Sequence, residues 1–311
     1  QIVLSAYVIR SACMKGEHFR EDMASEAMME MYLRLIMGHN GEFIYNSADN
    51  GYLYTAALEN DMMAYQSAKE EWWYTHAVED LWLPYMEEVK QKYNGNMPLY
   101  LQNIFYYLIS CRYMINLQDR DKFVLNPEKA IAFHEVCKKA MQYFDERVIM
   151  RRKLPGLKVG HPMRMVFLKD RLQEGGAFVE TGYDALQMFY TSRDGAGKAI
   201  KKYGIGRFDK DRLIISILNE EKGKFVIDGR LAGVAILYSK GYQAYGVIET
   251  TTEKEIRRFP LVPSTAYALL HCFGVSYAKN DRVHVEIPYK ELFTPGRRLR
   301  FYVQIEEDRY P

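Results

Sequence analysis

The sequence has few cysteines and no pattern that would tie them together. Its 311 residues include four, Cys13, Cys111, Cys137 and Cys272, and no two of them form a Cys-x-x-Cys pair. Cysteines this far apart in a long chain are not typical of a disulfide framework. No Asn-x-Ser/Thr glycosylation acceptor occurs either. We therefore expect reduced, mostly buried thiols and a cytoplasmic chain, or one incorporated in a particle assembled inside the cell.

The sequence also lacks an apolar run of the kind that spans a membrane. Its most apolar long segment, residues 99–117, is interrupted by Gln102 and Arg112, whereas a span needs roughly 18 or more apolar residues with few or no charges. We interpret the segment as a buried helix. The opening stretch Ile2–Met14 contains Arg10 and no small-residue cleavage pattern, so we expect no signal peptide there.

No nucleotide-binding motif is complete. Gly195-Ala196-Gly197-Lys198 resembles the end of a P-loop, but the full motif needs a glycine where Ser192 stands and a hydroxyl residue where Ala199 stands. The ligand for the magnesium ion is therefore missing. We interpret the segment as a turn that leads into a basic helix.

Catalytic and metal motifs are incomplete as well. The segment 274–278 resembles a degraded nucleophile elbow, but a turn between strands follows it and His284 is the only later histidine. We therefore expect Ser276 to be an ordinary strand residue. His134 and Cys137 are one helical turn apart, yet two ligands do not close a zinc site. We assign no catalytic residue, no cofactor and no metal.

The first part of the chain has helical spacing. Apolar residues recur every three to four positions in Arg20–Met37, and the segment 61–93 is helical with an expected kink near Pro84. Asn126-Pro127-Glu128 is typical of a helix start, with an N-cap, a first-turn proline and an acid. We expect that helix to run to about Arg151.

The period changes to two in the last third of the chain. Val283, Val285 and Ile287 alternate with polar residues, as do the apolar residues of the segment 299–305. Between these parts lie several glycines, and we expect helices at 182–192 and 197–203. We therefore predict an α+β fold.

We expect this fold to have three parts. A helical domain covers 1–150, and a basic connecting segment of mixed structure covers 151–212. An antiparallel β sheet or small sandwich covers 213–311.

Charge is unevenly distributed between these parts. Residues 1–146 carry 13 Lys and Arg against 21 Asp and Glu, whereas residues 147–212 carry 15 against 7. Basic groups interleaved with aromatic residues and glycine turns are typical of contacts with phosphates. A positive surface that pairs with the acidic helices, within one chain or between chains, is the alternative. The candidate polyanion or subunit contacts are Arg151, Arg152, Lys153, Arg193, Lys198, Lys201, Lys202 and Arg207.

The composition is also rich in side chains favoured at protein interfaces. The chain has 25 Tyr and 16 Met, and Tyr, Met, Trp and Arg are enriched at such interfaces. In Trp72-Trp73-Tyr74, three consecutive aromatic residues on a helix cannot all face one core. We expect at least one of these candidate interface aromatics to be exposed or to contact a partner. A Tyr- and Met-rich core is the alternative.

These features favour a non-enzymatic structural or interaction protein, a subunit of a larger assembly such as a virion. Acidic helices of one copy would meet the basic segment of the next. Two alternatives stay open: a nucleic-acid-binding protein that uses residues 151–210, and an enzyme of unidentified class with a dispersed site. The expected partners are other protein subunits, with nucleic acid as the alternative.

Overall fold

The structure is a computed structural model, and it divides into two compact units. Unit 1 comprises Gln1–Gly160 with Cys272–Gly274, and unit 2 comprises His161–His271 with Val275–Pro311. We keep the predicted boundaries at residues 150 and 212 as predictions. The structure describes residues 11–38, 67–117, 124–150, 161–172, 181–184, 187–193, 196–207, 212–232, 242–263, 271–277 and 282–305.

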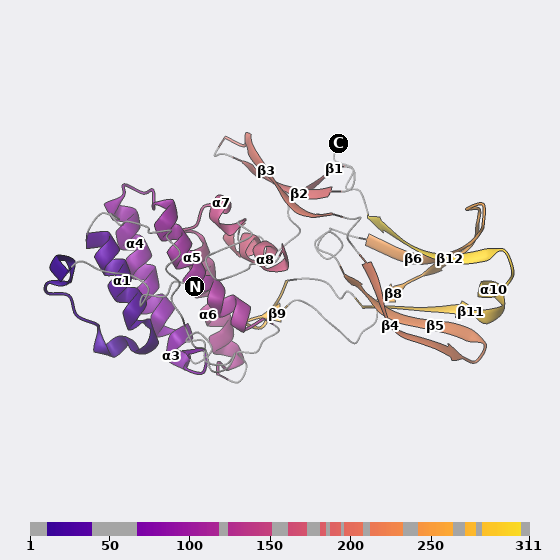
Figure 1. Cartoon of the computed structure of the whole chain (residues 1–311), viewed down its shortest axis with the longest axis horizontal. Helices are drawn as coiled ribbons and strands as arrows, with labels where there is room; N and C mark the ends of the chain where they lie inside the picture. The colour runs from indigo at the N-terminus through magenta and orange to yellow at the C-terminus, as the bar shows by residue number, and fades with distance from the viewer. Residues whose placement is uncertain are drawn as a thin grey trace. The chain divides into compact units, whose positions relative to one another are not determined.

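The described part of unit 1 is built mainly from helices (Figure 1). Two are 3₁₀ helices and one is a π-helix, and the others are α-helical. They are η2 (Ser11–Met14), η3 (Glu21–Glu26), α1 (Ala27–Gly38), α3 (Glu71–Tyr74), the π-helix η5 (Ala77–Trp82), α4 (Leu83–Lys92), α5 (Leu99–Ile115), α6 (Pro127–Met141) and α7 (Glu146–Ile149).

Local sequence signals explain where these helices begin and end. The Asn126 side chain accepts a hydrogen bond from the Lys129 backbone N–H, as expected of the N-cap of α6. Pro84 lies in the first turn of α4, directly after the π-helical turn η5. The kink predicted near Pro84 stays a prediction. The helix predicted to run to Arg151 ends at Met141 instead. Asp145 starts a new short helix there, because its carboxylate accepts from the Arg147 N–H.

The apolar segment from Leu99 forms α5, and its one charged residue is buried. Arg112 donates through Nη2 to Glu26 Oε1 at 3.1 Å and through Nε to the Trp73 carbonyl at 3.0 Å. The Trp73 indole donates to the same carboxylate at 2.6 Å, and the guanidinium lies 4.3 Å from the Trp73 ring centroid. Burial of Arg112 is tolerated because its charge is paired and its donors have acceptors. Within the described residues, no helix is both long and apolar enough to cross a membrane.

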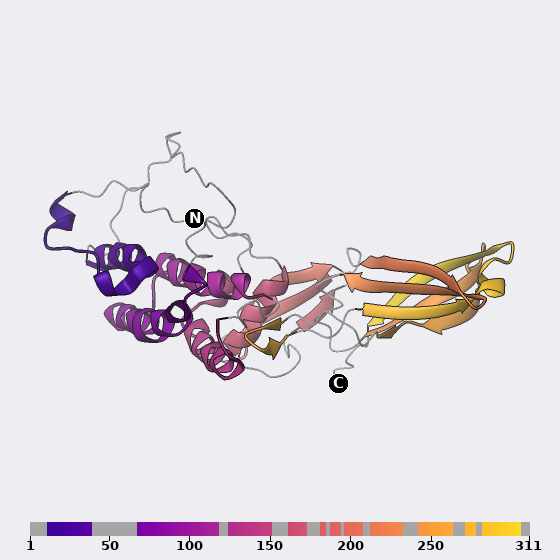
Figure 2. The same ribbon diagram turned by 90° about the horizontal axis from the view of Figure 1, so that it is seen from below.

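The described part of unit 2 is mainly β structure. A helix precedes its strands and a short helix lies before the last one (Figures 1 and 2). The elements are α8 (His161–Leu172), β1 (Thr181–Asp184), β2 (Gln187–Arg193), β3 (Ala199–Arg207), β4 (Arg212–Glu221), β5 (Lys224–Ala232), β6 (Tyr242–Thr250), β7 (Glu255–Pro260), β8 (Val262–Pro263), β9 (His271–Cys272), β10 (Val275–Ser276), β11 (Arg282–Pro288), α10 (Tyr289–Leu292) and β12 (Arg297–Ile305).

The larger strands form three antiparallel sheets, with strand orders β1-β2-β3, β4-β5-β11-β8 and β12-β6-β7. The last two sheets share one apolar core. It combines Ile227 of β5 and Val285 of β11 from one sheet with Ile248 of β6 and Phe259 of β7 from the other. The alternation predicted for residues 283–287 is confirmed. The segment 299–305 forms strand β12, but Val303 is 39% exposed, so buried and exposed residues do not alternate along all of it. The helical N-terminal half and the antiparallel C-terminal sheets confirm the α+β fold.

The helices predicted at 182–192 and 197–203 are wrong, because the structure has strands there. Of the glycines that suggested turns between short helices, Gly197 lies in the turn of a β hairpin, and Gly204 and Gly206 lie within strand β3. Phe189-Tyr190-Thr191 is a run of aromatic and β-branched residues, which fit a pleated strand better than a helix. Pairing of β2 with β3 supplies hydrogen-bond partners that neither segment has alone.

Candidate polyanion-binding hairpin

The β2–β3 hairpin brings several of the predicted basic residues together. Antiparallel pairing places Thr191 opposite Lys202 and Ser192 opposite Lys201. A bulge then places Arg193 opposite Ala199. Gly197, in the turn, has φ +80°, a backbone conformation that side chains with a Cβ rarely adopt. The turn resembling the end of a P-loop therefore leads into strand β3 and not into the basic helix that we expected.

Consecutive lysines of β3 use opposite faces of the hairpin. Because side chains alternate along a strand, Lys201 and Lys202 point to different sides. Lys201 Nζ lies 5.1 Å from the centroid of the Tyr203 ring, and Lys202 Nζ lies 4.3 Å from that of Phe189. The rings of Tyr203 and Phe189 are therefore each paired with a lysine of the hairpin itself. This arrangement holds the two ammonium groups above partly buried rings.

The hairpin carries an excess of positive charge. Residues 187–207 contain five basic residues and one acidic residue. Lys198, Lys201 and Lys202 are exposed. Among the described residues, no carboxylate forms an ion pair with Lys201 or Lys202. Their positive charge is therefore directed at solvent and available to an anion.

The remaining predicted basic contacts are less well defined. Arg193 is exposed, and its Nη1 donates to the Gly197 carbonyl at 2.9 Å across the turn. Arg207 stands at the end of β3, opposite Gln187 in the register. Arg151, Arg152 and Lys153 lie outside the described residues.

The candidate interface aromatics belong largely to the core of unit 1. Trp73 and Tyr74 are buried, and only Trp72 is partly exposed. Tyr74 packs edge-on against Phe133 with ring centroids 5.5 Å apart. Of the three residues, Trp72 alone keeps some surface toward solvent.

The nucleophile-elbow resemblance at Ser276 corresponds to a tight hairpin. Strands β9 and β10 are joined by Phe273-Gly274, which have positive φ values of 52° and 74°. This is the conformation of a two-residue hairpin turn and not of a strand-to-helix elbow. Ser276 lies in β10, as expected of an ordinary strand residue. His134 and Cys137 are both buried in α6.

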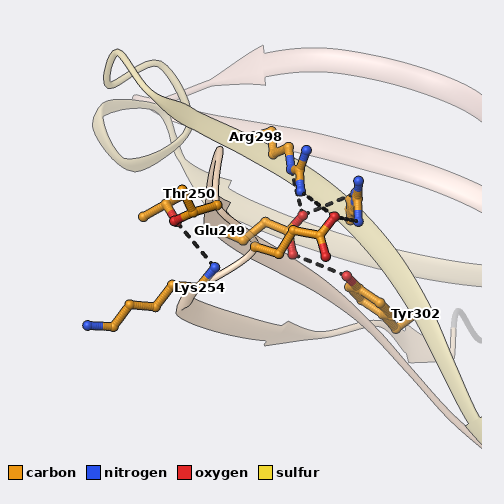
Figure 3. Close-up of polar contacts among 8 residues, drawn as sticks. Glu249, Thr250, Lys254, Arg298 and Tyr302 are labelled. Atoms are coloured by element: carbon orange, nitrogen blue, oxygen red, sulfur yellow. Dashed lines mark hydrogen bonds and ion pairs between the residues drawn. The ribbon is translucent and has the colours of Figure 1, made fainter.

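A second polar cluster lies on β6 and β12 and was missed by the sequence analysis (Figure 3). Glu249 is 3% exposed, and its carboxylate accepts from Arg298 Nε at 2.7 Å and from the Tyr302 hydroxyl at 3.1 Å. Arg300 Nε lies 3.1 Å from the same carboxylate. The alternation of β12 hid this cluster, because Arg298, Arg300 and Tyr302 look like ordinary solvent-facing residues. Only pairing with β6 places them around Glu249.

The chemistry of this cluster is that of a structural ion pair. Burial tends to raise the pKa of Glu249, but the hydrogen bonds from Arg298 and Tyr302 outweigh it and lower the pKa below its usual value. Glu253 accepts from both Arg298 and Arg300, at 3.0 and 3.2 Å. The carboxylate is thus held ionised between fixed donors, which suits a structural role better than that of a general base.

Neither protein-family models nor curated proteins match the chain. A search of solved structures matches the crystal structure of S. aureus TarS with 14% sequence identity and a TM-score of 0.38. The match covers 95% of this chain and 48% of that chain, so this chain spans about half the length of the protein that it matches.

The expectation of a non-enzymatic assembly subunit is corrected here, because this match does not bear it out. At a TM-score of 0.38 the likeness carries neither the fold nor the activity of TarS to this chain.

Proposed function

We propose that the β2–β3 hairpin binds linear polyanions through Lys201 and Lys202. The observation that carries this proposal is the pair of exposed ammonium groups of Lys201 and Lys202, which have no carboxylate partner in the described part of the chain. Phosphate groups release counterions when lysines neutralise them, so a lysine on either face of the hairpin adds affinity without specific contacts.

The contacts of the hairpin rings favour charge over stacking as the source of affinity. Tyr203 and Phe189 already carry a lysine over the ring, and Tyr190 is buried and stacked on Tyr203 with centroids 6.4 Å apart. Proteins that bind single strands by stacking present uncovered aromatic faces to the bases. The ligand is therefore defined by its regular negative charge, and the expected affinity does not depend on bases.

The test is a titration of the full chain with fluorescently labelled inorganic polyphosphate and with an oligothymidylate of equal charge, over a range of salt concentrations. We expect both to bind with similar affinity and to be released by salt. Replacement of both lysines, Lys201→Gln with Lys202→Gln, should lower the slope of log affinity against log salt by roughly 0.7 for each lost contact.

The matched control removes two lysines elsewhere on unit 2. Lys254 and Lys290 are exposed, and the variant Lys254→Gln with Lys290→Gln has the same net charge as the hairpin variant. It should keep the parent affinity and slope. Absence of binding by the parent at low salt, or equal slopes in both variants, would exclude the proposed surface.

A further inference from the structure

Strand β4 forms one edge of the sheet β4-β5-β11-β8. It is 10 residues long, whereas the opposite edge strand β8 has two residues and ends in Pro263. Within the described residues, β4 is hydrogen-bonded to β5 alone. A long unpaired edge presents a row of backbone donors and acceptors, and natural sheets usually block such an edge with charge, proline or a covering segment.

Large apolar side chains of β4 are exposed on both of its faces. Ile214, Ile215, Ile217 and Leu218 are 40, 45, 54 and 56% exposed. Ile214 pairs with Arg230 on the outer side of the sheet, whereas Leu218 pairs with the core residue Ile227. Leu218 therefore lies at the rim of the core, uncovered on the side where a further strand would lie.

The other long edge strands of the sandwich are protected differently. Strand β7 carries Glu255, Arg257 and Arg258, and β12 carries three arginines in its first four residues. Strand β4 has no charged residue between Arg212 and Glu220. Its edge thus lacks the charges that protect the other sheet from further pairing.

The backbone of β4 is held close to β5, so the position of this edge strand is fixed. Gly229 of β5 faces Ile215, and a Cβ at Gly229 would come within 2.7 Å of the Ile214 carbonyl oxygen. The absence of a side chain at Gly229 permits this approach. Pairing continues on both sides of the bulge between Ile215 and Ile217.

We infer that β4 pairs antiparallel with β4 of a second copy of this chain. The charges at the ends of β4 favour a second copy as the partner, because the strand begins with Arg212 and ends with Glu220 and Glu221. Antiparallel pairing about a two-fold axis places Arg212 opposite the partner's Glu221, and the apolar centres of both strands cover each other. The same surface then serves both copies, as in an isologous dimer. This inference does not depend on polyanion binding.

The test is the mass of the full chain by light scattering during size-exclusion chromatography, over a range of protein concentrations. We expect twice the 36.5 kDa of the chain. Ile217→Lys should reduce the mass to that of the monomer, whereas Ile256→Lys on β7, where Ile256 is 42% exposed, should leave the dimer intact. Circular dichroism checks that both variants are folded.

Charge exchange identifies the occupant. Arg212→Glu and Glu221→Arg should each weaken the dimer at least tenfold, and the double exchange should restore it. A monomeric parent, a mass other than that of a dimer, or a dimer that persists with Ile217→Lys would overturn the inference. Failure of the double exchange to restore the dimer would overturn antiparallel self-pairing and indicate a different partner strand.

Discussion

Two regions of unit 2 use charged side chains in opposite ways. On β12, two arginines are neutralised by the carboxylates of Glu249 on β6 and of Glu253 in the turn between β6 and β7, and the Tyr302 hydroxyl completes the cluster. On the β2–β3 hairpin, Lys201 and Lys202 face solvent over aromatic rings without a carboxylate partner among the described residues. The paired charges of the first region stabilise the fold, whereas the lysines of the hairpin remain available for a ligand.

The largest effect is expected where paired charge is also fully buried. In unit 1, Glu26→Ala leaves Arg112 without its counter-ion and removes the acceptor of the Trp73 indole. Loss of one partner from a buried pair costs about 3 to 5 kcal/mol of unfolding free energy. Urea denaturation of the variant measures this loss.

An exposed pair of unit 1 provides the control. Glu71 and Lys129 form an ion pair in which both side chains are about half exposed, and Glu71→Ala should cost at most about 1 kcal/mol. Equal losses in the two variants would show that burial of the pair is unimportant.

The next largest effect is expected on the β6–β12 face. Glu249→Gln should lower the melting temperature by several degrees, because Arg298 and Arg300 then lose a buried counter-charge. Glu253 contacts the same arginines but is 66% exposed, so Glu253→Gln should lower it less. Thermal unfolding followed by circular dichroism measures both, and a larger effect at Glu253 would contradict the structural role given to Glu249.

The same cluster predicts loss of stability in acid. The pKa of Glu249 is lowered in the folded protein, despite burial, by hydrogen bonds from Arg298 and Tyr302. A lowered pKa stabilises the fold above the unfolded pKa, here about 4.5, and this contribution is lost as the pH falls through the folded value. Melting temperatures between pH 7 and pH 3 should therefore fall less steeply for Glu249→Gln than for the parent.

Removal of the exposed lysines of the β2–β3 hairpin should leave the stability of the fold almost unchanged. Lys201→Gln with Lys202→Gln removes no ion pair and only two exposed lysine–ring contacts, so the unfolding free energy should fall by no more than about 1 kcal/mol for each site. Denaturation of the variant used in the titration checks this. A large loss of stability would show that the lysines support the fold rather than a ligand.

The smallest effect is expected at His284, on β11. A hydrogen bond with Asp228, at 2.8 Å between Nδ1 and Oδ1, raises the pKa of this imidazole. A raised pKa stabilises the fold fully below the unfolded value of about 6.5 and loses this contribution as the pH rises through the folded value. Asp228→Asn should move the pKa of His284 down, measured by NMR titration, with little change in melting temperature. An unchanged pKa would exclude Asp228 as its cause.

Local patterns in the sequence predicted the elements whose signals are short-range. The Asn126 N-cap, the apolar helix from Leu99 and the alternating strand around Val285 each depend on neighbours within a few positions, and each is confirmed. The basic character of the segment that contains Lys201 and Lys202 is likewise a property of the sequence itself. The faces on which Lys201 and Lys202 lie follow from the strand conformation of β3. They could not be predicted correctly, because a helix was expected there.

The α+β class, the buried apolar segments and the positive charge of the hairpin are therefore properties that can be predicted from residue order alone. Three features depend on the folded chain: Glu249 contacts Arg298 across 49 residues, Glu26 contacts Arg112 across 86, and β4 is an edge strand. Contacts between segments far apart in the chain determine whether a charge has a partner. They also determine whether a strand lies in the centre or at the edge of a sheet. Local propensity and spacing carry no information about those contacts.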